Sequence, residues 1–81
     1  SLVYPANYGV ITQTLAGDGD NLDILVYTRS PVQSGALILA RPIGVLKMID
    51  GGEQDDKIIA VPADEIDPTY ADIKSVTDLP A

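Results

Sequence analysis

Leu22-Asp-Ile-Leu-Val-Tyr-Thr28 decides the fold, because β-branched and aromatic residues dominate it. Three further apolar runs follow along the chain, at Ala36–Ala40, Ile43–Ile49 and Lys57–Val61. Each run is short and is bounded by Gly, Pro, Asp or Ser, which is typical of strands. A short extended piece is also expected over Tyr8–Thr12. The sequence therefore predicts an all-β protein with four or five strands.

Turn-forming residues separate these runs, over 16–21, 30–35 and 50–56. Gly51-Gly52 lies between two of the apolar runs and predicts the tip of a hairpin. Short strands at regular spacing favour a small antiparallel barrel or a sandwich. A partly open, five-stranded antiparallel barrel of the OB type fits a chain of this length, so we expect that architecture.

The tail after Ala63 is the one part of the chain with helical spacing. Tyr70, Ile73 and Val76 are three residues apart, but the prolines around them limit any helix to a short turn. The chain has 81 residues, enough for a single domain, which we expect to span 1–81. A core of this size is marginal. Three explanations stay open: very good packing, self-association, or a sequence cut from something larger.

Composition excludes several kinds of chemistry. The chain has no Cys and no His, which removes disulfides, thiolate and imidazole metal sites, Ser-His-Asp hydrolysis and cysteine nucleophiles. Twelve acidic residues against five basic ones give a net charge of −7, which disfavours nucleic acid and anionic membranes as partners. No apolar run approaches the length of a membrane span, so we expect a soluble protein with a cytoplasmic location.

Clustered aspartates are the sharpest feature of the sequence. Asp18-Gly-Asp20-Asn-Leu-Asp23 places three carboxylates in six residues, directly before the first apolar run. A second cluster, which contains Asp50 and Asp55, lies in the predicted hairpin. If both loops emerge at one end of a barrel, their carboxylates converge and raise one another's pKa unless cations compensate them. Oxygen ligands of this kind select Mg²⁺, Mn²⁺ or Ca²⁺.

The spacing alone leaves simpler explanations open. The first cluster fails the EF-hand formula, and ordinary turn chemistry explains it as well as a metal site does. A solvated hairpin tip explains the second cluster better than a metal site does. The hydroxyl of Tyr8 either binds a phosphate oxygen or belongs to a half-buried packing residue. Lys57 either binds an anion or pairs with Asp55 or Asp56.

Several groups of residues follow one another in a specific order. They are Tyr4-Pro-Ala-Asn-Tyr-Gly-Val-Ile11, Thr14-Leu15, Asp18–Val26, Arg41–Met48, Asp50, Asp55, Lys57, Ala60-Val-Pro62, Asp72-Ile73 and Asp78-Leu-Pro80. In this order the chain resembles the soluble family I inorganic pyrophosphatases, from about Tyr4 to Pro80. The Asp-Gly-Asp-x-x-Asp motif in this context is highly specific, and it favours the metal interpretation.

The resemblance implies an OB-type barrel that hydrolyses pyrophosphate to two phosphates with Mg²⁺, or with Mn²⁺ in its place. By the same resemblance, four aspartates match metal ligands: Asp18, Asp23, Asp50 and Asp55. Asp20 matches the catalytic carboxylate that helps to deprotonate the attacking water. Tyr8 and Lys57 match positions that bind phosphate oxygens. Cations between substrate and protein also explain how a chain of net charge −7 binds a multiply anionic substrate.

The resemblance also implies that parts of the family fold are absent. Family members are much longer, with N-terminal strands and a C-terminal helix that accompany further site residues. We therefore expect a central barrel segment with impaired activity, which forms a homo-oligomer through its uncovered apolar surface and sheet edges. The alternative is an excised or reconstructed OB-barrel core, a non-catalytic structural module with at most weak binding of divalent metals. An OB-type oligonucleotide binder is disfavoured, because the sequence lacks a basic, aromatic-lined face.

Overall fold

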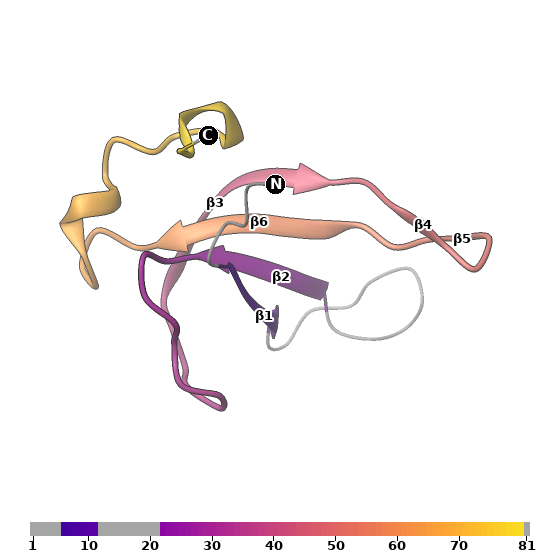
Figure 1. Cartoon of the computed structure of the whole chain (residues 1–81), viewed down its shortest axis with the longest axis horizontal. Coiled ribbons are helices and arrows are strands. Elements are labelled where there is room, and N and C mark those ends of the chain that lie inside the picture. The colour runs from indigo at the N-terminus through magenta and orange to yellow at the C-terminus, as the bar shows by residue number, and fades with distance from the viewer. Residues whose placement is uncertain (1–5, 12–21, 81) are drawn as a thin grey trace.

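The structure is a computed structural model, and it describes residues 6–11 and 22–80. These residues are mostly β, with two short 3-10 turns and no α-helix (Figure 1). The elements in chain order are β1 (Ala6–Ile11), β2 (Leu22–Tyr27), β3 (Ala40–Leu46), β4 (Ile49–Asp50), β5 (Glu53–Gln54), β6 (Lys57–Pro62), η1 (Pro68–Tyr70) and η2 (Val76–Asp78). The prediction of a mostly β chain with a short helical turn near its C-terminus is confirmed. Within the described ranges, no helix has the length and apolarity that a membrane crossing needs.

One four-stranded sheet forms most of the molecule, with its strands in the order β1-β2-β6-β3 (Figure 1). The outer pairs are antiparallel, whereas β2 and β6 run parallel. The predicted all-antiparallel arrangement is therefore wrong, because β3 and the hairpin return the chain so that β6 enters in the same direction as β2. The described strands also form an open sheet and not the five-stranded barrel, since β1 and β3 lie at opposite edges and do not pair with each other.

The segment between β2 and β3 is an exposed arm, which Figure 1 shows projecting from the sheet, and not the strand predicted over Ala36–Ala40. Leu37 is 91% exposed and Leu39 is 55% exposed, so the arm buries little of the apolar surface that suggested a strand. β3 begins only at Ala40 and includes Pro42. A proline, which lacks a backbone N–H, is tolerated there because β3 is an edge strand whose register shifts just after it.

The predicted hairpin tip at Gly51-Gly52 is confirmed. Gly51 and Gly52 have φ angles of 59° and 83°, in the left-handed region that residues with a side chain rarely adopt. They join β4 to β5, which pair with Asp50 opposite Glu53. The two glycines therefore allow the tight reversal that separates this small hairpin from the main sheet.

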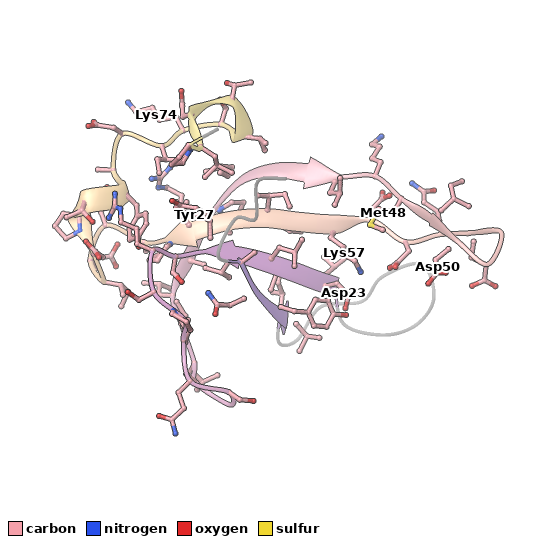
Figure 2. All side chains as sticks on the ribbon, in the orientation of Figure 1. Asp23, Tyr27, Met48, Asp50, Lys57 and Lys74 are labelled. Carbon is pink, nitrogen blue, oxygen red and sulfur yellow. The ribbon has the colours of Figure 1, made fainter. Side chains whose placement is uncertain are left out.

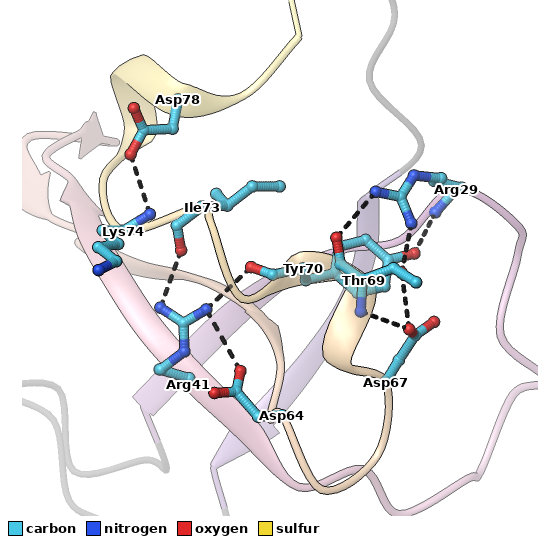
Figure 3. Close-up of polar contacts among 9 residues, drawn as sticks. All are labelled: Arg29, Arg41, Asp64, Asp67, Thr69, Tyr70, Ile73, Lys74 and Asp78. Carbon is cyan, nitrogen blue, oxygen red and sulfur yellow. Dashed lines mark hydrogen bonds and ion pairs between the residues drawn. The ribbon is translucent and has the colours of Figure 1, made fainter.

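The core lies where the C-terminal tail packs against the sheet. Tyr27 and Val61 from the central strands are buried together with Tyr70 and Ile73 from the tail. The rings of Tyr27 and Tyr70 meet edge to face, 6.1 Å apart at 81°. The guanidinium of Arg41 in β3 donates to the carbonyl oxygens of Tyr70 and Ile73 at 3.0 and 2.8 Å (Figure 3). The tail thus supplies half of the small core and is fixed to the sheet by an arginine fork.

Gly44→Ala is expected to destabilise the chain by about 1–3 kcal/mol, because the added Cβ has no room. The second 3-10 turn packs so close to β3 that this Cβ would lie 2.6 Å from Cγ2 of Val76. Urea unfolding followed by circular dichroism measures the loss. Gly9→Ala is the control, since its Cβ would meet Cγ2 of Ile24 at an ordinary 3.6 Å. Equal stability of the two variants would contradict the close packing at Gly44.

Acid is expected to weaken the attachment of the second 3-10 turn. The backbone N–H groups of Lys74 and Ser75 donate to the carboxylate of Asp78 at 2.9 and 3.2 Å, and these bonds lower its pKa below the ordinary 3.8. A carboxyl whose pKa falls on folding contributes stability above its unfolded pKa and loses it as the pH drops through the folded value. Asp78→Asn should therefore reduce the fall in melting temperature between about pH 5 and pH 2. An identical fall in wild type and variant would refute this role.

Candidate functional site

Four of the predicted site residues meet at one end of the sheet. β2 and β6 run parallel with Asp23 directly opposite Lys57, and Figure 2 shows the two side chains lying together. β1 pairs with β2 in a register that places Tyr8 diagonal to Asp23 on the same face. Asp55 follows the hairpin and is held by a 2.9 Å bond from its backbone N–H to the carbonyl oxygen of Met48. The strand pairing therefore builds the group from three separate stretches of sequence.

The ammonium of Lys57 links the two carboxylates. Its Nζ donates to Oδ2 of Asp23 and to Oδ2 of Asp55, each at 3.2 Å. The side chain of Lys57 is 15% exposed, and those of the two aspartates are 24% and 29% exposed, so the group is shielded but still open to solvent. The same Nζ lies 5.3 Å from the centre of the Tyr8 ring, within the range of cation–π attraction.

Three of these groups are held in their usual protonation states. The hydroxyl of Tyr8 donates to Asp23 and, together with the Lys57 ammonium, lowers the pKa of Asp23. The same hydrogen bond raises the pKa of Tyr8, so the phenol keeps its proton. Burial works to lower the pKa of Lys57, but hydrogen bonds to Asp23 and Asp55 outweigh burial and the pKa is raised. At neutral pH the site therefore presents a negative Asp23, a positive Lys57 and a neutral phenol.

The oxygen atoms of this group are of the chemical type that binds a hard divalent cation. Two carboxylate oxygens converge on one positive charge, and oxygen donors are the ligands that Mg²⁺ and Mn²⁺ prefer. Within the described ranges, no three acidic side chains lie close enough together to hold a metal by themselves. Further ligands therefore have to come from other residues than the pair of Asp23 and Asp55.

The seven predicted site residues fall into three groups. The structure brings together Tyr8, Asp23, Asp55 and Lys57. Asp50 is exposed in β4 and lies toward the hairpin, apart from this group (Figure 2). Asp18 and Asp20 lie outside the described residues. The placement of the first group is thus established, while the chemical roles of all seven stay predictions.

Sequence reasoning missed Asn7, whose side-chain amide ties β1 to β2. The amide bonds the carbonyl oxygen of Val26 and the hydroxyl of Thr28 and also accepts a bond from the backbone of Val32. A signal for it was present in the sequence. Asn is depleted in strands, so an asparagine inside an extended segment and next to a candidate site tyrosine indicates a specific polar contact.

The sheet and its polar end define a small, mostly β protein that holds two carboxylates, an ammonium and a phenol side by side. The family model for inorganic pyrophosphatase matches residues 1–81 of the chain. Inorganic pyrophosphatase 1 of Pseudomonas syringae pv. tomato is 56% identical over 80 residues, which cover 99% of this chain and 46% of the relative. The inorganic pyrophosphatase of Aquifex pyrophilus is 54% identical over 80 residues, which cover 99% of this chain and 45% of that relative.

Solved structures agree with these relatives. The inorganic pyrophosphatase of Helicobacter pylori matches with a TM-score of 0.87 and 47% identity, over 95% of this chain and 45% of that chain. The enzyme of Thermus thermophilus matches with a TM-score of 0.85 and 40% identity, over 95% of this chain and 43% of that chain. The chain therefore belongs to the inorganic pyrophosphatase family, as its sequence predicted. It spans less than half the length of the relatives that it matches.

Proposed function

We propose that the chain carries the central part of an Mg²⁺-dependent site that hydrolyses pyrophosphate to two phosphates. The observation that carries the proposal is the convergence of Asp23, Asp55, Lys57 and Tyr8 in a member of this family. Two carboxylates suit a cation, whereas an ammonium and a phenol suit the oxygens of an anion. A substrate that combines a metal ion with a phosphate anion satisfies both halves of the group.

In this proposal Asp23 and Asp55 hold Mg²⁺, or Mn²⁺ in its place. Asp18 and Asp50 are proposed as the further ligands, and Asp50 would have to approach from the hairpin to reach the metal. The metal supplies two effects when bound, since it neutralises phosphate charge and lowers the pKa of water. Asp20 accepts a proton from the attacking water, a role for which a carboxylate suffices in a chain without His.

Substrate binding is assigned to the other half of the group. Lys57 and Tyr8 carry N–H and O–H donors at the same end of the sheet, and we propose that they donate to phosphate oxygens. The raised pKa values of both groups keep these protons in place at neutral pH. Charge-assisted bonds of this kind are stronger than neutral ones, so Lys57 is expected to contribute more than Tyr8.

We further propose that residues 1–81 form a single domain. An apolar hollow of about 230 Å³ lies on the face of the sheet and is lined by side chains that include Leu25, Ile59, Leu46 and Val76. Such a surface is unfavourable in water and favours association, so a homo-oligomer is expected. A cytoplasmic location stays a prediction from the sequence.

A second candidate is a non-catalytic structural module that binds divalent metals weakly at most. One observation favours it: no third acidic side chain joins the Asp23–Asp55 pair within the described residues.

Phosphate release from Mg-pyrophosphate, measured for wild type and Asp20→Asn, decides between the two candidates. The first predicts release that needs Mg²⁺ and falls about a hundredfold in the variant, the lower part of what a positioned base contributes. Glu65→Gln changes an exposed carboxylate in the tail and should keep the wild-type rate. Absent release, or release that Asp20→Asn leaves unchanged, favours the structural module.

A further inference from the structure

The side-chain amide of Asn7 joins three segments of the chain. Its Nδ2 donates to the carbonyl oxygen of Val26 at 3.1 Å and to Oγ1 of Thr28 at 2.8 Å, and its Oδ1 accepts from the backbone N–H of Val32 at 3.0 Å. These partners belong to β2, to its C-terminal end and to the exposed arm. Thr28 is buried and donates in turn to the carbonyl oxygen of Ser30. The amide is therefore part of a continuous polar network on one face of the sheet.

Tyr8, the next residue, points to the opposite face. Side chains alternate along a strand, so Asn7 and Tyr8 lie on different faces of β1, and Tyr8 shares its face with Asp23 and Lys57. A slip of β1 by one residue would move Tyr8 to the wrong face. Bonds that fix the register of Asn7 against Val26 therefore also fix the face and the position of Tyr8.

Apart from the pairing of β1 with β2, little else among the described residues holds Tyr8 in place. The side chain is 64% exposed, so packing contributes little to its position. β1 is an edge strand that pairs with β2 alone within the described sheet, and the glycine after Tyr8 adds no side-chain packing. The hydroxyl also interacts with Asp23, but that contact belongs to the site itself.

We propose that Asn7 is a positioning residue, which fixes the register of β1 and so holds the Tyr8 ring next to Lys57 and its hydroxyl next to Asp23. The described partners of the Asn7 side chain are Val26, Thr28 and Val32, none of which is a site residue, so Asn7 acts on the described site residues through the strand. The proposal rests on the proposed function for the use of the phenol as a phosphate donor, whereas the positioning itself is a property of the folded chain.

The ring of Tyr8 offers a direct readout of its own position. An aromatic ring shifts the NMR signals of nearby nuclei, and Nζ of Lys57 lies 5.3 Å from the ring centre. The ¹H–¹³C signal of the Lys57 ε-methylene is recorded for wild type, for Asn7→Ala and for Tyr8→Leu. The Tyr8→Leu variant gives the chemical shift of this signal when no aromatic ring is present. We expect Asn7→Ala to move this signal most of the way to its position in Tyr8→Leu.

Thr28→Val is the matched control, because it removes one buried partner of the amide and leaves the bonds to Val26 and Val32. Its Lys57 signal should stay at the wild-type position. A folded Asn7→Ala that keeps the wild-type signal overturns the proposal, and so does Thr28→Val moving the signal equally far. If Asn7→Ala does not fold, Asn7→Asp removes both donated bonds and keeps the acceptor for Val32. An unmoved signal in that variant overturns the proposal in the same way.

The measurement uses no substrate, so it separates two kinds of failure. Absent phosphate release from the wild type refutes the proposed function and leaves the Lys57 signal to decide on Asn7. A retained signal in Asn7→Ala refutes the positioning role, whatever the rate of hydrolysis.

Discussion

Tyr70→Ala is expected to leave the chain with little or no net stability at room temperature. Tyr70 is 4% exposed and is one of the four residues of the core cluster, where its ring meets that of Tyr27 edge to face. Truncating a buried aromatic residue to alanine costs about 3–5 kcal/mol. A small domain has a total stability of about 5–15 kcal/mol, and a chain of this size lies near the lower end.

Further contacts of Tyr70 add to the stability that this substitution removes. Its hydroxyl accepts the backbone N–H of Arg29 at 2.9 Å, and the guanidinium of Arg29 lies 4.4 Å from the ring centre. Its carbonyl oxygen accepts from Arg41, whose other nitrogen bonds Ile73. A shift of the tail after truncation therefore disturbs both arginines and leaves the sheet without its cover.

Urea unfolding followed by circular dichroism tests this expectation. Tyr70→Phe keeps the ring and loses only the acceptor for Arg29, which should cost about 1 kcal/mol. Tyr8→Ala removes a tyrosine that is 64% exposed and should leave the midpoint close to that of wild type. A cooperative transition of Tyr70→Ala near the wild-type midpoint would show that the core does not depend on the tail.

Lys57→Met is expected to lower Mg²⁺-dependent phosphate release by about 10³-fold, the upper end for one lost electrostatic group. The lysine serves two purposes in the proposed site. It compensates the charges of Asp23 and Asp55, to which Nζ donates at 3.2 Å each, and it supplies the donor for a phosphate oxygen. Methionine keeps most of the apolar stem and removes the charge, so the loss reports on the ammonium.

The affinity for Mg²⁺ should move in the opposite direction. An opposite charge within about 4–6 Å of a carboxylate weakens its affinity for another cation, and for protons the effect is about tenfold or more. Without the Lys57 ammonium, Asp23 and Asp55 should therefore bind Mg²⁺ about tenfold more tightly. Calorimetric titration with Mg²⁺ measures this change in the absence of pyrophosphate.

The two readouts of Lys57→Met together distinguish local from global damage. Lys74→Met is the control, because Lys74 is an exposed lysine of the tail and should change neither quantity. Weaker Mg²⁺ binding in Lys57→Met would contradict the idea that the lysine and the cation compete for the same carboxylates. An unchanged rate would contradict the assignment of Lys57 to the substrate.

The strands that the sequence predicted best are the buried ones. The runs around Leu22–Thr28 and Lys57–Val61 became β2 and β6, because β-branched residues between turn signals suit the centre of a sheet. The glycine pair of the hairpin was equally readable, since only a reversal needs two residues with left-handed φ angles. These elements are determined by the residue types within each short segment, and those can be read from a single sequence.

The direction in which strands pair was not readable in the same way. Alternation of side chains records which face of a strand is buried but not whether its neighbour runs parallel, so the parallel pairing of β2 with β6 was missed. The run Ala36–Ala40 looked like a strand from its apolar residues, yet Leu37 is almost fully exposed in the arm. A side chain is buried only if other segments of the chain pack against it, and the sequence of a short apolar run does not show whether they do.

The candidate site was predicted in part for the same reasons. The resemblance matched Tyr8, Asp23, Asp55 and Lys57 to one site, and the strand register brings them together. Asp50 does not join them, because the hairpin carries it away from the end of the sheet. The residue type of Asn7 indicated a polar contact, but its partners were not visible, since they lie 19 and 25 residues further along the chain.

The parallel pairing of β2 with β6 also has a consequence for the rate at which the site forms. The bond between Lys57 and Asp23 joins residues 34 positions apart, and the arm, β3 and the hairpin lie between them in the chain. Non-local pairings of this kind form slowly and late in folding. Interactions that appear after the folding barrier slow unfolding and leave the folding rate almost unchanged. A cation held by Asp23 and Asp55 would therefore lengthen the lifetime of the folded chain without hastening its formation.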